Sequence, residues 1–398
     1  MPPGQIARVV VVAGTIAGAL AAGSAALRAQ AAAPEDHYRY NILSVTDTAP
    51  GQYPLVTFSV TDPLNGNRPY DIKNDPAFTV FAGGASRLFV QIGWSTRDYT
   101  NTGSQSELAP TAPAPALPVA VNALLASTAN PDLTFTVRSA KPIPLGATGS
   151  GTVAIEGHPA VDITGDGVPE RLQVRSEFRH FAITDPSPVA RRASVDITRC
   201  TQCHQPHLST HGNNRTDEIQ VCVMCHNPNA TDIAYRTSGP ETPIDFKRMV
   251  HAIHAGGMRH TPFVVIGFQG SVNDFSGVRF PGNLKKCETC HLPGRYGLPL
   301  KRGAQATTVS TGSVYGPTRT IDGDPGNDLN ITPIAAVCSS CHDDSETISH
   351  MVRTGGASFS ARQADIDAGR VRERCVSCHG KGKDKDVFRV HEADGDGN

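Results

Sequence analysis

Several kinds of residue are scarce in this chain of 398 residues, and each scarcity excludes a class of protein. Basic and acidic residues nearly cancel (36 against 37), so the chain lacks the positive surplus typical of nucleic-acid binding. Only 18% of the residues are charged, and the chain has a single Trp. By contrast it has 38 Gly and 30 Pro, which favour turns and short strands over long helices. After the N-terminal segment, no apolar run reaches the roughly 18–20 residues of a membrane span.

The long apolar stretch at the N-terminus, residues 1–31, has the pattern of a secretory signal peptide. Arg8 supplies a positive start, residues 9–27 are apolar or small, and Ala29-Gln30-Ala31 fits a cleavage site. A single membrane anchor is the alternative, but the stretch is rich in Ala and Gly and therefore weakly hydrophobic. We expect an exported protein without a membrane span in its mature form. Because no Cys lies near the cleavage site, we expect no lipid attachment there.

Cysteine is absent from the first half of the chain, where strand patterns dominate instead. In residues 54–60, Val56, Phe58 and Val60 share one face, and the residues between them are polar. Similar patterns occur at residues 78–81, 87–94, 133–138, 152–155 and 171–178. We predict an antiparallel all-β sandwich or small barrel over residues 37–190. The composition changes after Asp185-Pro186-Ser187-Pro188, so we place a second domain at residues 195–398.

The second domain contains all ten cysteines of the chain, in five copies of Cys-x-x-Cys-His. In such a motif the two thiols add to the vinyl groups of one haem, and the His becomes the proximal iron ligand. The Cys and His contents alone would give about 0.01 copies by chance. We predict five covalently bound haems c. The attachment residues are Cys200, Cys203, Cys222, Cys225, Cys287, Cys290, Cys338, Cys341, Cys375 and Cys378. The proximal ligands are His204, His226, His291, His342 and His379.

Other uses of paired cysteines fit the motif less well. Disulfide frameworks and zinc ribbons do not need a His after each pair, and thioredoxin-like chemistry needs one motif in a βαβ setting. Haem density is also informative, because residues 200–398 would hold one haem per roughly 40 residues. So little protein cannot enclose five macrocycles in separate apolar pockets. We therefore expect haems that pack against one another and partly face solvent.

The second axial ligand of each iron decides between an electron carrier and an enzyme. An iron with His on both sides transfers electrons only, whereas an open iron can bind and reduce a small molecule. Seven His after Cys200 lie outside the motifs, which is enough for five irons. The predicted distal ligands are His211, His251, His254, His350 and His391.

The choice among these seven His rests on local patterns. His251 and His254 are three apart on a short helix predicted for residues 245–256, with Asp245 as its N-cap. His211 is preferred to His207, because His207 follows the proximal His204 by only three residues. His260 is the weakest of the seven, and His37, His158 and His180 are interpreted as surface residues of the β domain. The loops Asp162–Glu170 and Asp322–Asp324 resemble oxygen-rich calcium sites, so Ca²⁺ is a further candidate ligand.

Four stretches of the second domain resemble a known family: residues 200–204 (CTQCH), 208–212 (LSTHG), 221–230 (VCVMCHNPNA) and 245–256 (DFKRMVHAIHAG). They are similar to the pentahaem module of the OmcA/MtrC-type decahaem outer-membrane cytochromes of metal-reducing bacteria. Residues 92–101 (IGWSTRDYTN) are similar to the β domain that precedes that module. The resemblance implies a split β-barrel or sandwich followed by a loop-rich, mostly irregular or α-helical multihaem cytochrome c domain. It also implies bis-His irons, with distal ligands at the five positions given above.

The resemblance further implies the role of the chain. Electrons would pass through closely packed haems to extracellular or periplasmic acceptors, such as metal oxides, chelated Fe(III), flavins or partner cytochromes in an outer-membrane electron-transfer complex. The chain would then be located at the cell surface, outside the cell or in the periplasm. The alternative is a multihaem reductase with one open haem that acts on a small oxyanion. Enzymatic activity, including metal reduction, is therefore left open, and an electron-transfer protein is preferred.

Overall fold

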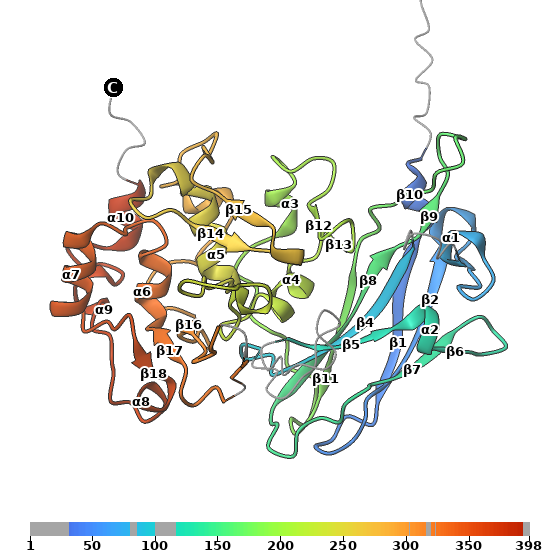
Figure 1. Cartoon of the computed structure of the whole chain (residues 1–398), viewed down its shortest axis with the longest axis horizontal. Coiled ribbons are helices and arrows are strands. Elements are labelled where there is room, and N and C mark those ends of the chain that lie inside the picture. The colour runs from blue at the N-terminus through green and yellow to red at the C-terminus, as the bar shows by residue number, and fades with distance from the viewer. Residues whose placement is uncertain are drawn as a thin grey trace, which may run out of the picture. The chain divides into compact units, whose positions relative to one another are not determined.

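Antiparallel strands connected by tight turns make up the first part of the structure, a computed structural model shown in Figure 1. It describes residues 32–79, 86–99, 117–301, 303–315, 320–322 and 324–392. The predicted signal peptide, residues 1–31, lies outside the described residues. From Pro34 on, the described residues belong to one compact unit. Within these ranges, no helix has the length and apolar character needed to cross a bilayer.

Two antiparallel sheets pack with their apolar faces together. One sheet has the strand order β1–β2–β7–β6, with β3 paired to β2, and the other has the order β11–β8–β4–β5. Phe58 of β2 and Ile155 of β8 belong to the same buried core, so the two sheets share it. The strands are β1 (Arg39–Thr46), β2 (Leu55–Asp62), β3 (Arg68–Pro69), β4 (Arg87–Trp94), β5 (Val119–Asn122), β6 (Thr128–Ala129), β7 (Phe135–Arg138), β8 (Ser150–His158) and β11 (Glu177–Ala182).

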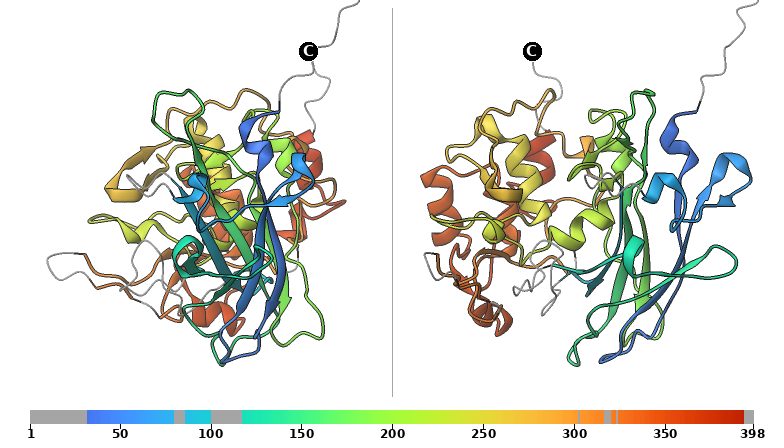
Figure 2. Two further views of the ribbon diagram at one scale, coloured as in Figure 1. Left: turned by 90° about the vertical axis from the view of Figure 1, so that its right-hand side faces the viewer. Right: turned by 45° about the vertical axis from the view of Figure 1, so that its right-hand side comes forward.

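The prediction of a β-rich chain with small antiparallel sheets is confirmed, and Figure 2 shows these sheets from two further directions. At one edge the sheets are joined through a side chain, because Arg179 of β11 donates to the carbonyl oxygen of Ile42 in β1 at 3.1 Å. Short elements complete this part of the chain. They are η1 (Pro34–His37), η2 (Pro63–Asn65), α1 (Pro76–Thr79), α2 (Ala123–Ala126), β9 (Ala160–Val161) and β10 (Glu170–Arg171).

Two of the predicted strands differ from the structure. The strand predicted at residues 78–81 is wrong where it is described, because residues 78 and 79 end helix α1. Pro76 fits the first turn of a helix, and Asp75 accepts a hydrogen bond from the amide of Ala77 at 2.9 Å. The strand predicted at 171–178 is interrupted, because β10 ends at Arg171 and β11 begins at Glu177.

Short helices and two- or three-stranded sheets make up the rest of the chain. The helices are α3 (Ile197–Cys200), α4 (Ile219–Cys225), η3 (Asp232–Ala234), α5 (Phe246–His254), η4 (Gly256–Met258), η5 (Phe268–Gly270), η6 (Cys287–Thr289), α6 (Pro333–Cys338), α7 (Ser345–Arg353), α8 (Gln363–Asp367), α9 (Val376–His379) and α10 (Val387–Glu392). The strands are β12 (Ser209–Thr210), β13 (Arg215–Thr216), β14 (Val264–Ile266), β15 (Val272–Asp274), β16 (Thr307–Ser310), β17 (Leu329–Ile331) and β18 (Ala361–Arg362).

Strand β8 is buried along its whole length, because it is covered on both faces. Its inner face contributes Val153 and Ile155 to the core between the sheets. On its outer face, Ala154 packs with residues of α4, including Met224. The interpretation of His158 as a surface residue is wrong, because its side chain, at the end of this strand, is fully buried.

Candidate haem-binding sites

Each of the five Cys-x-x-Cys-His motifs forms a single helical turn. The amide of the His donates to the carbonyl oxygen of the first Cys in every motif, at 3.0 Å for His204 and 2.9 Å for the other four. Residues i, i+3 and i+4 of such a turn lie on one face. Both thiols and the imidazole therefore lie along the same face of each motif, as covalent attachment to one haem requires.

The ten thiols are all free of disulfide bonds. Burial raises the pKa of Cys200 to about 11, and that of Cys222 and Cys338 to about 12. Cys203 and Cys378 are exposed. No group of three or more His, Cys, Asp or Glu within the described ranges is arranged to hold a metal ion. The motifs therefore do not pair with one another as the knuckles of a zinc ribbon would.

The ten His predicted as ligands meet in five pairs, each containing one His of a motif and one His from outside the motifs. We number these sites by the order of the motifs. The ring centroids lie 6.1 Å apart in site 1 (His204 and His254), 6.0 Å in site 2 (His226 and His211), 5.8 Å in site 3 (His291 and His251), 6.1 Å in site 4 (His342 and His391) and 6.2 Å in site 5 (His379 and His350).

These separations can be compared with the geometry of a metal ion held between two imidazoles. With a metal–nitrogen bond of about 2.0–2.1 Å and a ring radius of about 1.2 Å, two ligands on opposite sides would place their centroids about 6.4–6.6 Å apart. The pairs observed here, at 5.8–6.2 Å, come close to that distance. The residues present thus fit an iron between the two rings of every pair.

Hydrogen bonds fix which ring nitrogen is available in six of the ten His. Nδ1 of His226, His254 and His391 donates to the carbonyl oxygens of Ile244, Val250 and Val387 at 2.8–2.9 Å. His251, His291 and His379 make the same kind of bond. Because a carbonyl oxygen only accepts, Nδ1 carries the hydrogen in the neutral ring. Nε2 then holds the lone pair that can bind iron.

Burial keeps several of these rings neutral. It lowers the pKa of His211 to about 3 and that of His291 to about 4. It also lowers the pKa of His226, His251 and His342 below the usual value for imidazole. A neutral imidazole is the form that binds a metal ion, so these rings need no deprotonation to act as ligands near neutral pH.

Helix α5 supplies one ring to each of two sites, His254 to site 1 and His251 to site 3. The sequence predicted this helix, but its cap is different. Asp245 is the residue before the first turn, yet its side chain makes no cap hydrogen bond to the helix. Instead, its carboxylate contacts Lys247 and accepts from the Thr307 hydroxyl at 2.5 Å. Asp245 therefore links α5 to β16.

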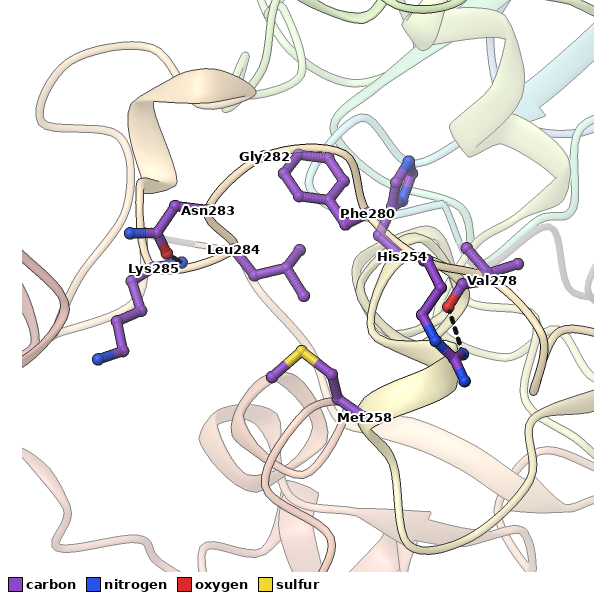
Figure 3. Close-up of a pocket in the computed structure, with 9 residues that line it drawn as sticks. His254, Met258, Val278, Phe280, Gly282, Asn283, Leu284 and Lys285 are labelled. Atoms are coloured by element: carbon purple, nitrogen blue, oxygen red, sulfur yellow. Dashed lines mark hydrogen bonds between the residues drawn. The ribbon is translucent and has the colours of Figure 1, made fainter.

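A recess of about 410 Å³ opens beside His254 of site 1 (Figure 3). Met258, Phe280 and Leu284 form its apolar walls, while Arg279 and Lys285 bring positive charge to it. Apolar walls suit the edge of a macrocycle, and cations suit its two propionates. Glycine is required beside the recess at Gly256, because a Cβ there would lie 2.0 Å from the carbonyl oxygen of Phe275.

Contacts between the segments show which sites are neighbours. Sites 1 and 3 share α5, and the amide of Leu292 next to His291 donates to Ser194 at 3.0 Å, near the start of the first motif. Sites 3 and 4 adjoin, because Arg248 of α5 donates to the hydroxyl of Ser339 in the fourth motif at 2.8 Å. Arg259, shortly after His254 of site 1, also pairs with Asp343 beside the fourth motif at 3.1 Å. Sites 1, 3 and 4 thus gather around α5.

Two further contacts complete this arrangement. Glu373, just before the fifth motif, accepts from the amides of Ile334 and Ala335 at 2.7 Å, in the helix that ends in the fourth motif, so site 5 follows site 4. Site 2 lies at the start of α5, because the amide of Phe246 donates to the carbonyl of His226 at 2.9 Å. Local sequence patterns do not indicate these pairings, because the pairings depend on how distant segments fold together.

The His left outside the pairs have other contacts. Nδ1 of His207 contacts a carboxylate oxygen of Asp217, and its Nε2 lies 3.5 Å from Glu35. His260 is exposed. In the β sheets, His180 is half-buried and bonds to the hydroxyl of Thr152 at 2.8 Å.

In the first of the two loops proposed for calcium, the carboxylates accept hydrogen bonds from backbone amides. Both carboxylate oxygens of Asp162 accept from the amides of Gly165 and Gly167, at 2.7 and 2.8 Å. Glu170 accepts from the amide of Ile163 at 2.8 Å. These carboxylates cap the turn. In the second loop Gly323 lies outside the described residues.

Comparisons with a family model and with solved structures each give a match. Residues 192–392 match the family described as "Outer membrane cytochrome MtrC/MtrF-like, domains II/IV". The fold is similar to that of MtrC from Shewanella baltica OS185, with a TM-score of 0.52 and 18% sequence identity, over 86% of this chain and 51% of that one. The chain thus spans about half the length of that protein. No sequence among curated proteins matches it.

Proposed function

Since the chain belongs to the family of MtrC/MtrF-like outer-membrane cytochromes, we propose that it is a multihaem cytochrome that transfers electrons to acceptors outside the cytoplasm. In this proposal each Cys-x-x-Cys pair attaches one haem, five in all, and each haem supplies a one-electron Fe(III)/Fe(II) couple. The protein contributes attachment, axial ligands and the spacing between neighbouring sites.

The observation that carries the proposal is the meeting of ten His in five pairs at centroid distances of 5.8–6.2 Å. The motif His would be the proximal ligands. The distal ligands would be His254, His211, His251, His391 and His350 for sites 1 to 5. With a ring on each side, an iron has no open position for a substrate. Five closed irons favour electron transfer over the reductase alternative.

The neighbouring sites support a route for electrons. Sites 1, 3 and 4 would form a cluster around α5, and site 5 would lie next to site 4. Site 2 would be a branch at the start of α5, next to β8. We propose that electrons enter and leave where the attachment segments reach the surface, at the exposed thiols Cys203, Cys341 and Cys378 of sites 1, 4 and 5.

The remaining features of the proposal follow from the family and the sequence. The chain would be exported by a signal peptide at residues 1–31 and would consist of a β domain (37–190) and a pentahaem domain (195–398). It would act at the cell surface or in the periplasm. Partner cytochromes of an outer-membrane complex would exchange electrons with it. Metal oxides, chelated Fe(III) or flavins would be the acceptors.

Mass spectrometry and electron paramagnetic resonance (EPR) test the number of haems and their ligands. We expect a covalent mass of five haems, only low-spin signals in the oxidised protein, and no carbon monoxide adduct in the reduced protein. The His254→Ala variant should open site 1, and therefore gain a high-spin signal and bind carbon monoxide. The matched control is His260→Ala, an exposed His outside the pairs, which should behave as the wild type. Carbon monoxide binding by the wild-type protein would contradict the proposal and favour the reductase.

A further inference from the structure

A buried ion pair lies beside site 2, between the sheet and the attachment segment. Nε of Arg215 is 2.5 Å from Oε2 of Glu156, and these side chains are only 15% and 2% exposed. Oε1 of the same carboxylate accepts a hydrogen bond from Gln91 at 2.9 Å. Buried charges of this kind are screened little by solvent and act over longer distances than exposed ones.

The chain places this pair next to both rings of site 2. Arg215 is directly opposite Thr210 in the β12–β13 hairpin, and the turn of that hairpin begins at His211. Glu156 lies two residues from Ala154 on the outer face of β8, where Ala154 packs against the residues of α4. Helix α4 carries Cys222 and Cys225 and leads directly to His226. The hairpin and the helix that hold site 2 thus enclose the ion pair against the sheet.

Hydrogen bonds beside the ion pair also connect it to site 2. The amide of Gly157, next to Glu156, donates to the carbonyl oxygen of Asn214, next to Arg215, at 2.8 Å. The side-chain amide of Asn214 in turn donates to the carbonyl oxygen of His211 at 2.6 Å. Both charged residues are therefore held next to a residue that contacts the backbone of a proposed ligand of site 2.

We propose that Arg215 and Glu156 set the reduction potential of the haem at site 2, with Arg215 raising it and Glu156 lowering it. This inference rests on the proposed function, because it needs a haem held by His226 and His211. Reduction from Fe(III) to Fe(II) takes up one electron, supplied by a redox partner or a chemical titrant, and breaks no bond. The added negative charge is stabilised by a nearby cation and destabilised by a nearby carboxylate.

A purely structural role for the ion pair predicts something different. The pair also fastens the β12–β13 hairpin to β8, so removing either partner weakens this contact. Loss of the contact alone would disturb site 2 in the same way for both substitutions. Opposite shifts of the potential, by contrast, follow only from the signs of the two charges.

The experiment is a redox titration of the full-length holoprotein followed by EPR. The rings of sites 2 and 3 are inclined by 27° and 17° and those of sites 1, 4 and 5 by 86°, 59° and 76°, which should separate the low-spin signals of sites 2 and 3 from the others. The low-spin signal that is lost in His211→Ala identifies site 2. At a fixed potential, Arg215→Gln should reduce the ratio of reduced to oxidised haem at site 2 about tenfold, which is a shift of 59 mV for one electron. Glu156→Gln should increase this ratio by a similar factor.

Three further variants make the result decisive. Arg215→Lys keeps the charge and should stay close to the wild type. The double variant Arg215→Gln/Glu156→Gln should return towards the wild-type potential. Arg138→Gln changes the net charge by the same amount at an exposed ion pair, with Asp47 at 3.3 Å, and should leave site 2 unchanged. A low-spin site 2 whose potential is unmoved, or moves in the same direction in both single variants, would overturn the inference and leave the proposed function intact.

Failure of the proposed function would look different. Mass spectrometry of the peptide with Cys222 and Cys225 reports whether the haem is attached, independently of any potential. A wild-type peptide without haem, or a wild-type site 2 that is high-spin, would overturn the assignment of its ligands and the inference together.

Discussion

The strands between residues 39 and 182 and the segment between residues 197 and 392 are stabilised in different ways. The first region shares one large core between two sheets, with Phe58, Phe78 and Phe135 completely buried. In the second region, a core cluster of α6, α7 and β17 has mostly small buried members: Ile331, Ala335, Ala336, Met351 and Ala357. Hydrophobic burial can explain why the first region folds, but it explains the second much less well.

We infer from this difference that the proposed haems would supply, in the second region, the buried apolar surface that a hydrophobic core supplies in the first. Its short helices end at the attachment motifs, so the side chains that would form a core elsewhere are replaced by thiols and imidazoles that face the haem positions. Each macrocycle would bring a large apolar surface to its site. The two regions should therefore respond differently to loss of haem, to core substitutions and to pH.

The largest effect is expected when the chain is made without haem attachment. We predict that the strands from residue 39 to 182 keep slowly exchanging amides, whereas residues 197–392 exchange almost freely, because little apolar surface remains to offset the entropy of ordering them. Hydrogen exchange with mass spectrometry measures both regions in one experiment. Equal protection of the two regions would show that the second has a sufficient core of its own.

Core substitutions should separate the regions in the holoprotein. Phe58→Ala removes a fully buried ring that lies 5.8 Å from the ring of Phe135, and should lower the free energy of unfolding of the sheets by about 3–5 kcal/mol. Met351→Ala in the second region should cost less, about 2 kcal/mol, because haem contacts would hold the segment. Trp94 is the only Trp and is buried in β4, so its fluorescence reports on the sheets during denaturation. The Soret absorbance reports on the second region.

A smaller effect is expected at acidic pH, and it belongs to the sheets. Burial, with a contribution from Arg171, lowers the pKa of His158 to about 4. The unfolded chain binds a proton at this residue near pH 6.5, and the folded chain does so only near pH 4. Stability is therefore retained above pH 6.5 and lost as the pH falls towards 4, by up to about 3 kcal/mol. His158→Gln should remove this loss, and identical pH profiles for the two proteins would refute the explanation.

The smallest effect is expected at the surface. Arg138→Gln breaks an ion pair with Asp47 in which both side chains are about half exposed, so the unfolding free energy should change by less than about 1 kcal/mol. Chemical denaturation measures it. A larger loss would mean that the edge of this sheet depends on the pair more than its exposure suggests.

Local sequence patterns predicted the elements that have one buried face. Residues 87–94 form β4 as expected, and the helix with His251 and His254 forms at Phe246–His254. The burial of His158 could not be predicted, because apolar and polar residues no longer alternate where both faces of a strand are covered. Covering of β8 by α4 is a tertiary contact that no local pattern encodes.

For the candidate sites, sequence patterns point to the individual residues but not to their pairing. The ten His named as ligands meet in pairs, and their role as ligands stays a prediction. Whether His251 or His254 lies opposite His204 depends on how the segments pack. Sequence reasoning also missed Arg215 and Glu156. They are separated by almost sixty residues, and neither belongs to a motif. They can be recognised only in the structure, where two opposite charges are buried together.

The His pairs also divide the chain into closed loops, which has a consequence for its unfolded state. With a haem in each pair, site 1 would close a loop of about 50 residues and site 3 one of about 40, and both would be fastened to the same short helix α5. The loop closed by site 5, from His350 to His379, lies inside the loop closed by site 4, from His342 to His391. Such nested cross-links restrict the unfolded chain as disulfides do. Weakening one axial bond on α5 should therefore loosen two loops at once, so this helix controls the cooperativity of the whole segment.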